Sequence, residues 1–115
     1  MREISKYTER SPRVVMHAFA SLYLGGEQIP GHIQNLSATG MAVVCTVRRE
    51  LGKTLQIEFY MGRSVGWIRI EGKLVRDEHV RQGFLWGLQF VELSDWVQAY
   101  LEGFVKDEII RTKVA

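Results

Sequence analysis

Residues Asn35 to Gly40 combine residue types that suit a turn or a ligand-binding site. Asn35 and Ser37 carry short polar groups, which can hydrogen-bond to nearby backbone or to a ligand. Gly40 permits a backbone conformation, or a close approach, that a side chain would block. Taken alone, the spacing Asn-x-Ser-x-x-Gly is typical of a polar β-turn. The rest of the chain must therefore decide whether this stretch also binds a ligand.

A second group with possible chemistry is the set of basic residues near the N-terminus. Four of them lie in the first 13 residues, beside two glutamates: Arg2, Lys6, Arg10 and Arg13, with Glu3 and Glu9. Such a segment can be a solvated tail or a site for a small anion. Because Pro12 disfavours a helical conformation at Ser11, we expect residues 1–13 to form a flexible basic arm without a helix at its end.

The remaining reactive residue types do not form a catalytic pattern. His17, His32 and His79 fall on separate segments and lack metal-binding spacing such as His-Glu-x-x-His. Ser37 has no nucleophile elbow around it. Cys45 lies in an apolar run, which favours a buried thiol over a reactive one. The sequence predicts no enzyme, no metal site and no cofactor.

Bulk composition indicates one folded domain. The chain has 115 residues, of which 46% are hydrophobic and 24% charged. Trp67 and Arg69 share one face of a predicted strand, an arrangement on which nucleic-acid bases can stack. However, the net charge of +2 is too small to indicate nucleic-acid binding. No apolar run approaches the roughly 20 residues that span a bilayer, and the first residues do not resemble a signal peptide. We expect a cytoplasmic protein with no nucleic-acid partner and no membrane insertion.

Alternating apolar residues predict six strands that position these groups. Alternation is clear over residues 14–24, 55–61, 68–74 and 84–90, residues 28–34 resume as a strand after a turn, and residues 41–47 are apolar enough to be a buried strand. Gly25 and Gly26 indicate a hairpin, and Pro30 with Gly31 suggests an edge or a bulge in the second strand. Residues 77–83 are polar and are predicted to form a loop. Short connections and alternating faces favour a small barrel, because closure removes exposed strand edges.

The period changes to helical after the last strand. Ser94 and Asp95 suit a helix start, and an apolar stripe follows at helical spacing over about 94–111. The stripe consists of Trp96, Val97, Tyr100, Leu101, Phe104, Val105 and Ile109. It can cover the barrel, or it can face a partner or a second subunit.

With these pieces in order, the chain resembles the PilZ domain, a bacterial receptor module for cyclic di-GMP. Three stretches carry the resemblance: the arginine arm that leads into the first strand, the motif from Asn35 to Gly40, and the late strand Trp86–Val91 followed by a helix. The family's second motif is (Asp/Asn)-x-Ser-x-x-Gly, and it is complete here.

The resemblance implies an all-β fold with one C-terminal helix, namely a six-stranded antiparallel PilZ-like β-barrel over residues 14–115. It also implies that cyclic di-GMP binds between the arm and the motif, at Arg10, Arg13, Asn35, Ser37 and Gly40. Arginine can bind phosphate bidentately and can stack on guanine or donate to its edge. The implied function is an effector or adaptor that relays the second-messenger level to a protein partner.

One position departs from the family's pattern. The family's arm reads Arg-x-x-x-Arg, and if Arg13 is its second arginine, the first position holds Glu9. Arg10 lies one residue closer and gives Arg-x-x-Arg. A glutamate there would repel phosphate, so the alternative function is a degenerate PilZ interaction module that does not bind cyclic di-GMP.

Overall fold

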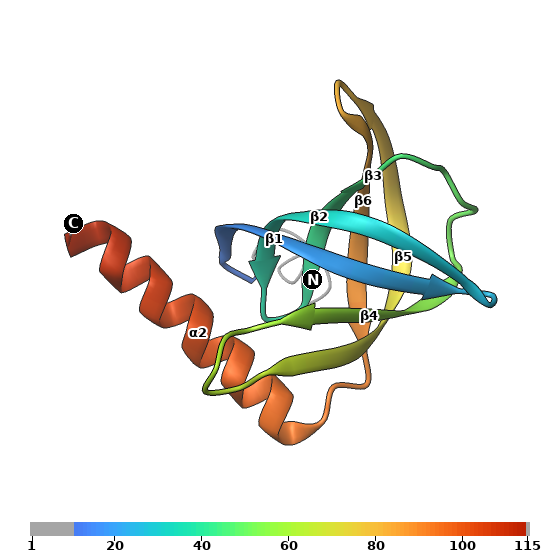
Figure 1. Cartoon of the computed structure of the whole chain (residues 1–115). Helices are drawn as coiled ribbons and strands as arrows, with labels where there is room; N and C mark the ends of the chain where they lie inside the picture. Colours follow the sequence, from blue (N-terminus) through green and yellow to red (C-terminus); the bar gives the residue numbers. More distant parts are fainter. Residues whose placement is uncertain (1–10, 115) are drawn as a thin grey trace, which may run out of the picture.

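The computed structural model describes residues 11–114, which form six strands and one helix (Figure 1). The elements are β1 (Arg13–Leu24), β2 (Glu27–Ser37), β3 (Gly40–Cys45), β4 (Thr54–Tyr60), β5 (Trp67–Val80), β6 (Gly83–Val91) and α2 (Asp95–Val114). All neighbouring strands are antiparallel, and they close a barrel in the order β1-β2-β3-β6-β5-β4. The predicted fold class is confirmed.

Alternate side chains of each strand fill the barrel interior. Leu22, Ile33, Ile57, Phe59 and Trp86 are fully buried there, and each contributes about 1.5–3 kcal/mol of hydrophobic stabilisation, or more for the largest rings. The indole nitrogen of Trp86 donates to the carbonyl oxygen of Val47 at 3.1 Å. The one polar group of this side chain is thereby satisfied, so the ring can be buried without an unpaired donor.

Cys45 is the last residue of β3 and is buried, as its apolar surroundings predicted. Burial raises the pKa of its thiol to about 12, and the negative charge of Asp77 adds to this effect. Because the thiolate is the reactive form, the thiol is inert at neutral pH.

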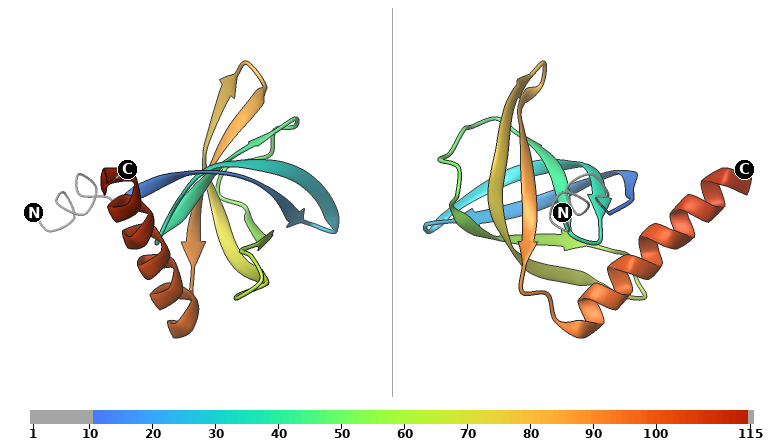
Figure 2. Two further views of the ribbon diagram at one scale, coloured as in Figure 1. Left: turned by 60° about the vertical axis from the view of Figure 1, so that its left-hand side comes forward. Right: turned by 180° about the vertical axis from the view of Figure 1, so that it is seen from behind.

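The prediction of a loop over residues 77–83 is wrong for most of these residues, because they belong to strands. β5 continues to Val80 and β6 begins at Gly83, so the two strands form a long hairpin that projects beyond the barrel (Figure 2). Two contacts stabilise it: the ring of His79 stacks across the hairpin on that of Phe84, with centroids 5.3 Å apart, and Arg48, from the β3–β4 connection, donates to Asp77 at 2.8 Å. The contact of Arg48 with Asp77 joins residues that are 29 positions apart in the sequence, so local polarity was misleading.

The prediction for Pro30 is correct in part. Pro30 pairs with Ser21 of β1, whereas the pairing of β2 with β3 begins only at His32. A proline is tolerated there because its missing N–H lies where β2 has a strand partner on one side only. The irregularity between β2 and β3 lies further along, between Ile33 and Asn35, and not at Gly31.

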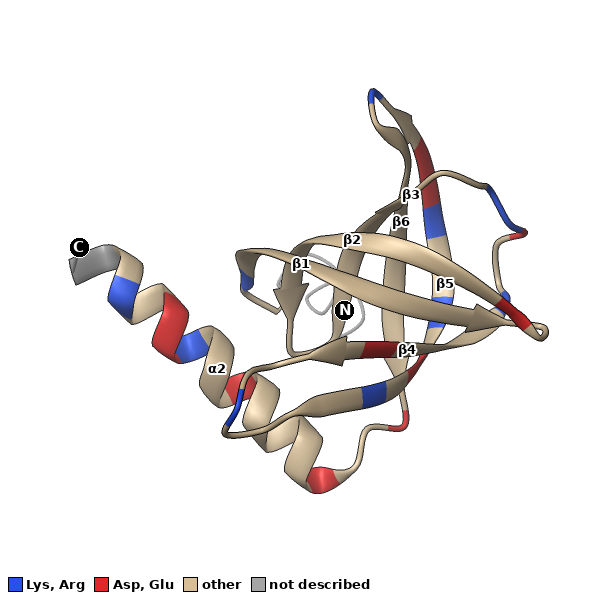
Figure 3. Cartoon of the chain, viewed as in Figure 1, with Lys and Arg blue, Asp and Glu red and all other residues tan. Residues whose placement is uncertain are grey.

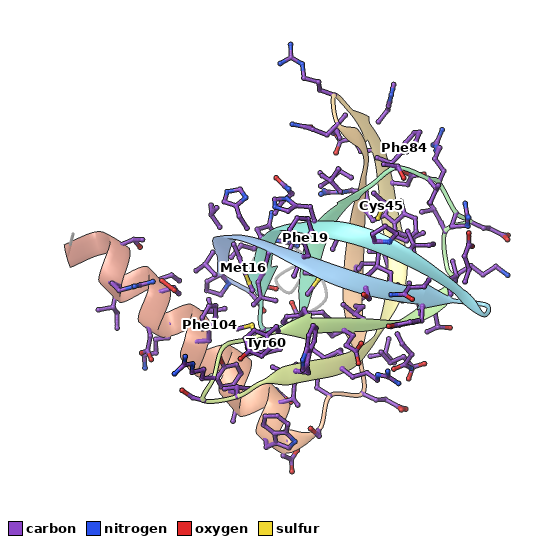
Figure 4. The ribbon with its side chains drawn as sticks, viewed as in Figure 1. Met16, Phe19, Cys45, Tyr60, Phe84 and Phe104 are labelled. Carbon is purple, nitrogen blue, oxygen red and sulfur yellow. The ribbon has the colours of Figure 1, made fainter. Side chains whose placement is uncertain are left out.

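The helix α2 lies across one end of the barrel (Figure 1). Val97, Leu101 and Val105 are buried, and Tyr100 and Phe104 pack against the core cluster, with Phe104 at the boundary between helix and barrel (Figure 4). The apolar stripe therefore covers the barrel, although Trp96 remains largely exposed. The helix runs to Val114, three residues beyond the expected end.

No helix in the described part of the chain is long and apolar enough to cross a membrane. The expected arm, residues 1–13, lies mainly outside the described residues, and its last residue, Arg13, is the first residue of β1.

Candidate functional site

The motif predicted from the sequence forms the tight connection between β2 and β3. β2 ends at Ser37 and β3 begins at Gly40. The hydroxyl oxygen of Ser37 accepts hydrogen bonds from the backbone N–H groups of Thr39, at 3.2 Å, and of Gly40, at 3.0 Å. Its proton can be donated to the carbonyl oxygen of Gly40 at 3.2 Å. With only 1% of its surface exposed, Ser37 uses its bonding capacity to shape the turn.

Gly40 is required by strand packing. It pairs with Gln89 of β6, and a Cβ atom added to it would overlap the carbonyl oxygen of Leu88. The sequence suggested that this glycine leaves room for a ligand. In the structure, the close neighbour that its missing side chain accommodates is the backbone of β6.

Asn35 and Arg13 meet on the outer surface of the barrel. A terminal nitrogen of the Arg13 guanidinium donates to the side-chain oxygen of Asn35 at 2.5 Å, across 22 residues of sequence. Arg13 is the only charged residue of β1 (Figure 3). The structure therefore brings together two of the predicted site residues as an exposed cation beside an amide.

The base of the arm also contacts the motif. The hydroxyl of Thr39 hydrogen-bonds to that of Ser11 at 3.3 Å, which connects the turn to the chain entering β1. Sequence reasoning did not single out Thr39, because its role depends on this contact across 28 residues. Arg10, the fifth predicted site residue, lies outside the described residues, as does Glu9.

The C-terminal half of α2 borders this region and was not predicted to do so. A groove of about 420 Å³ separates Ser11, Pro12 and Ala38 from the helix residues Val105 and Ile109. A second hollow, of about 260 Å³, lies between Arg13, Val14 and Val15 on one side and Glu108, Ile109 and Thr112 on the other. The apolar period of the helix indicated a covering role but not which strand end it would reach.

Aromatic rings continue the outer surface of β1 and β2 beyond Arg13. The rings of His17 and His32 stack with centroids 5.6 Å apart, and Phe19 contacts His32 edge-on at 5.3 Å. Phe19 is 78% exposed. His17 lies on a strand face, as its alternation with core residues predicted, and the side chain of Gln34 hydrogen-bonds to the ring of His32. This surface combines flat rings with amide groups beside the Arg13–Asn35 pair.

The barrel, its C-terminal helix and the Arg13–Asn35 pair agree with a match to a known family. Residues 8–107 match the PilZ domain family, so the chain belongs to that family. No curated protein matches the chain.

Solved structures share the fold at low sequence identity. The inhibitor of motility MotI/DgrA of Bacillus subtilis superposes with a TM-score of 0.78 at 17% identity, covering 90% of this chain and 52% of its own. YcgR of Escherichia coli in complex with c-di-GMP gives 0.76 at 20% identity, covering 92% of this chain and 49% of its own. The isolated PilZ domain of YcgR with c-di-GMP gives 0.69 at 18% identity, covering 92% and 96%. The chain thus spans about half the length of MotI and YcgR.

Proposed function

We propose that this protein binds cyclic di-GMP on the outer surface of the barrel, between the arm and the β2–β3 turn. The single observation that carries the proposal is the Arg13–Asn35 contact, which places an arginine beside the amide of a complete PilZ motif. Membership of the PilZ family and the c-di-GMP complexes of YcgR support this choice of ligand.

The chemistry of the ligand suits these groups. Cyclic di-GMP carries two phosphates and two guanines. Arg13 can donate two parallel hydrogen bonds to a phosphate or stack on a guanine face. Asn35 offers both a donor and an acceptor, which a guanine edge requires. Ser37 and Gly40 are proposed to act by holding the turn that presents Asn35, since the hydroxyl of Ser37 is already bonded within it. Arg10 is proposed to close over the ligand.

Calorimetric titration with cyclic di-GMP tests the proposal. We expect saturable binding at one site, and Arg13→Ala should weaken it at least a hundredfold, because a charged hydrogen-bonding group on a phosphate contributes about 1.5–3 kcal/mol per contact. GTP and cyclic di-AMP serve as ligand controls.

Lys53→Ala is the matched control for charge. Lys53 is exposed and lies 3.8 Å from Glu50 in the β3–β4 connection, away from the motif. This variant should bind like the unmodified protein. If folded protein produces no heat with ligand at high micromolar concentration, cyclic di-GMP is not its ligand.

The binding step is proposed to act as a signal and not as a reaction. Ordering an arm against Arg13 and Asn35 changes the surface near β1 and α2, and this changed surface is proposed to be recognised by a protein partner in the cytoplasm. Ordering costs conformational entropy, so the affinity depends on charge-assisted contacts that exceed this cost.

A second candidate function is protein interaction without nucleotide. Glu9 favours it, since it occupies the first arginine position of the arm. Large exposed apolar side chains also favour it, including Phe19 and Trp67, with Trp67 contacting Tyr60 edge-on at 5.4 Å. Co-purification of a partner from nucleotide-rich extract separates the two: loss on Arg13→Ala supports the nucleotide-dependent effector, and retention supports this alternative.

A further inference from the structure

A straight row of residues crosses five neighbouring strands beside the motif. Asn35 pairs with Val15 on one side and with Ala42 on the other. Ala42 pairs with Gly87, and Gly87 pairs with Arg76. The row therefore runs from β1 through β2, β3 and β6 to β5, and it connects the Arg13–Asn35 contact with an arginine from the far side of the barrel.

This row lies on the outside of the barrel. Val15 is 76% exposed and Arg76 is also exposed. Directly paired residues of antiparallel strands share a face. Met41 and Val43 point into the core cluster, so Ala42 between them points outward.

No large side chain projects from the middle of the row, because its two residues, Ala42 and Gly87, are small. Gly87 has no side chain, and the Arg76 side chain lies across it: a Cβ atom added to Gly87 would be 3.1 Å from the Cβ of Arg76 and 3.6 Å from its Nε. The Arg76 side chain therefore lies over β6 at Gly87. Ala42 contributes only a methyl group and is 1% exposed, so no large side chain of the row itself stands between Arg76 and Asn35.

Arg76 is available for an anion. Among residues 11–112, no carboxylate forms an ion pair with it. The neighbouring Asp77 is held by Arg48 at 2.8 Å, and its side chain is 7% exposed. The charge of Arg76 is therefore not neutralised by the acidic residue next to it in sequence.

The spacing suits a ligand with two anionic halves. Adjacent strands lie about 4.8 Å apart, so three steps separate the backbones of Asn35 and Arg76 by about 14 Å. Arg76 lies at one end of this span, and Arg13 and Asn35 lie at the other. We infer that Arg76 is an additional ligand-contacting residue, which binds the second phosphoguanosine half while Arg13 and Asn35 bind the first.

This inference rests on the proposed function, and one titration series tests both. Cyclic di-GMP is titrated into the unmodified protein and into Arg76→Ala, Arg76→Lys and Gly87→Ala. We expect Arg76→Ala to weaken binding about tenfold to a hundredfold, and Arg76→Lys to recover part of the loss by restoring the charge. Gly87→Ala keeps the charge but pushes the Arg76 side chain aside, so we expect a loss of about threefold.

Arg81→Ala is the matched control, since Arg81 is an exposed arginine in the turn between β5 and β6 and lies outside the row. Thermal unfolding midpoints show whether each variant is folded. Affinity for Arg76→Ala equal to that of the unmodified protein, or a loss matched by Arg81→Ala, overturns the role of Arg76 and leaves the proposed function intact. Absence of binding by the unmodified protein overturns both.

Discussion

The two halves of the motif Asn35–Gly40 behave differently in the structure. Asn35 lies at the outer surface and receives a hydrogen bond from Arg13. Ser37 and Gly40 are buried, and their contacts are with the turn and with β6. One short motif therefore contains a group that faces outward and two groups that build the support beneath it. The first half should control binding, and the second half should control stability.

The largest effect is expected at Gly40. Gly40→Ala places a methyl group against the carbonyl oxygen of Leu88, and we expect it to lower the free energy of unfolding by about 3 kcal/mol, measured by urea denaturation. Gly103→Ala is the control. A Cβ atom there meets nothing within 4 Å, so this helix substitution should stabilise by about 1 kcal/mol. Equal effects at the two glycines would contradict a packing role for Gly40.

Ser37→Ala should destabilise without a specific loss of affinity. It leaves the N–H groups of Thr39 and Gly40 without their acceptor, which should cost about 2 kcal/mol in urea denaturation. The exposed Ser64, changed to alanine, should alter stability by less than about 0.5 kcal/mol. If folded Ser37→Ala protein binds cyclic di-GMP far more weakly, the hydroxyl contacts the ligand and the two halves are not separate.

Asn35→Ala should have the opposite profile. We expect about a tenfold loss of affinity in calorimetry, equivalent to about 1.4 kcal/mol, with stability changed by less than about 0.5 kcal/mol. Gln28→Ala removes an exposed amide at the far end of the same strand, where it bonds only to Ser21 in the described chain. That variant should bind normally. A large stability loss in Asn35→Ala would assign Asn35 to the supporting half.

The smallest effect is expected for Asn35→Asp. The aspartate keeps the oxygen that accepts from Arg13 and adds a charge, and the family's motif takes either residue at this position. We expect affinity within about threefold of the unmodified protein, because a stronger bond to Arg13 offsets the loss of the amide donor. A loss as large as that of Asn35→Ala would show that the amide N–H is the essential group.

Local pattern predicted most of the fold. The period of two over β1, β4, β5 and β6 identified which residues face the core, and the change of period at Asp95 identified α2. The error at residues 77–83 has a physical reason. Asp77 is polar, but it is held by Arg48, which lies 29 residues away in the sequence, and His79 stacks on Phe84, its partner across the hairpin.

For the candidate site, the sequence by itself determined the motif's residue types and its place between two strands. Only the tertiary structure decided that Ser37 is enclosed by its own turn, that Arg13 contacts Asn35, and that Arg76 lies across Gly87. The reason is that turn chemistry depends on neighbours within a few residues, whereas these juxtapositions depend on strand register. Register is set by closure of the whole barrel and packing of its core.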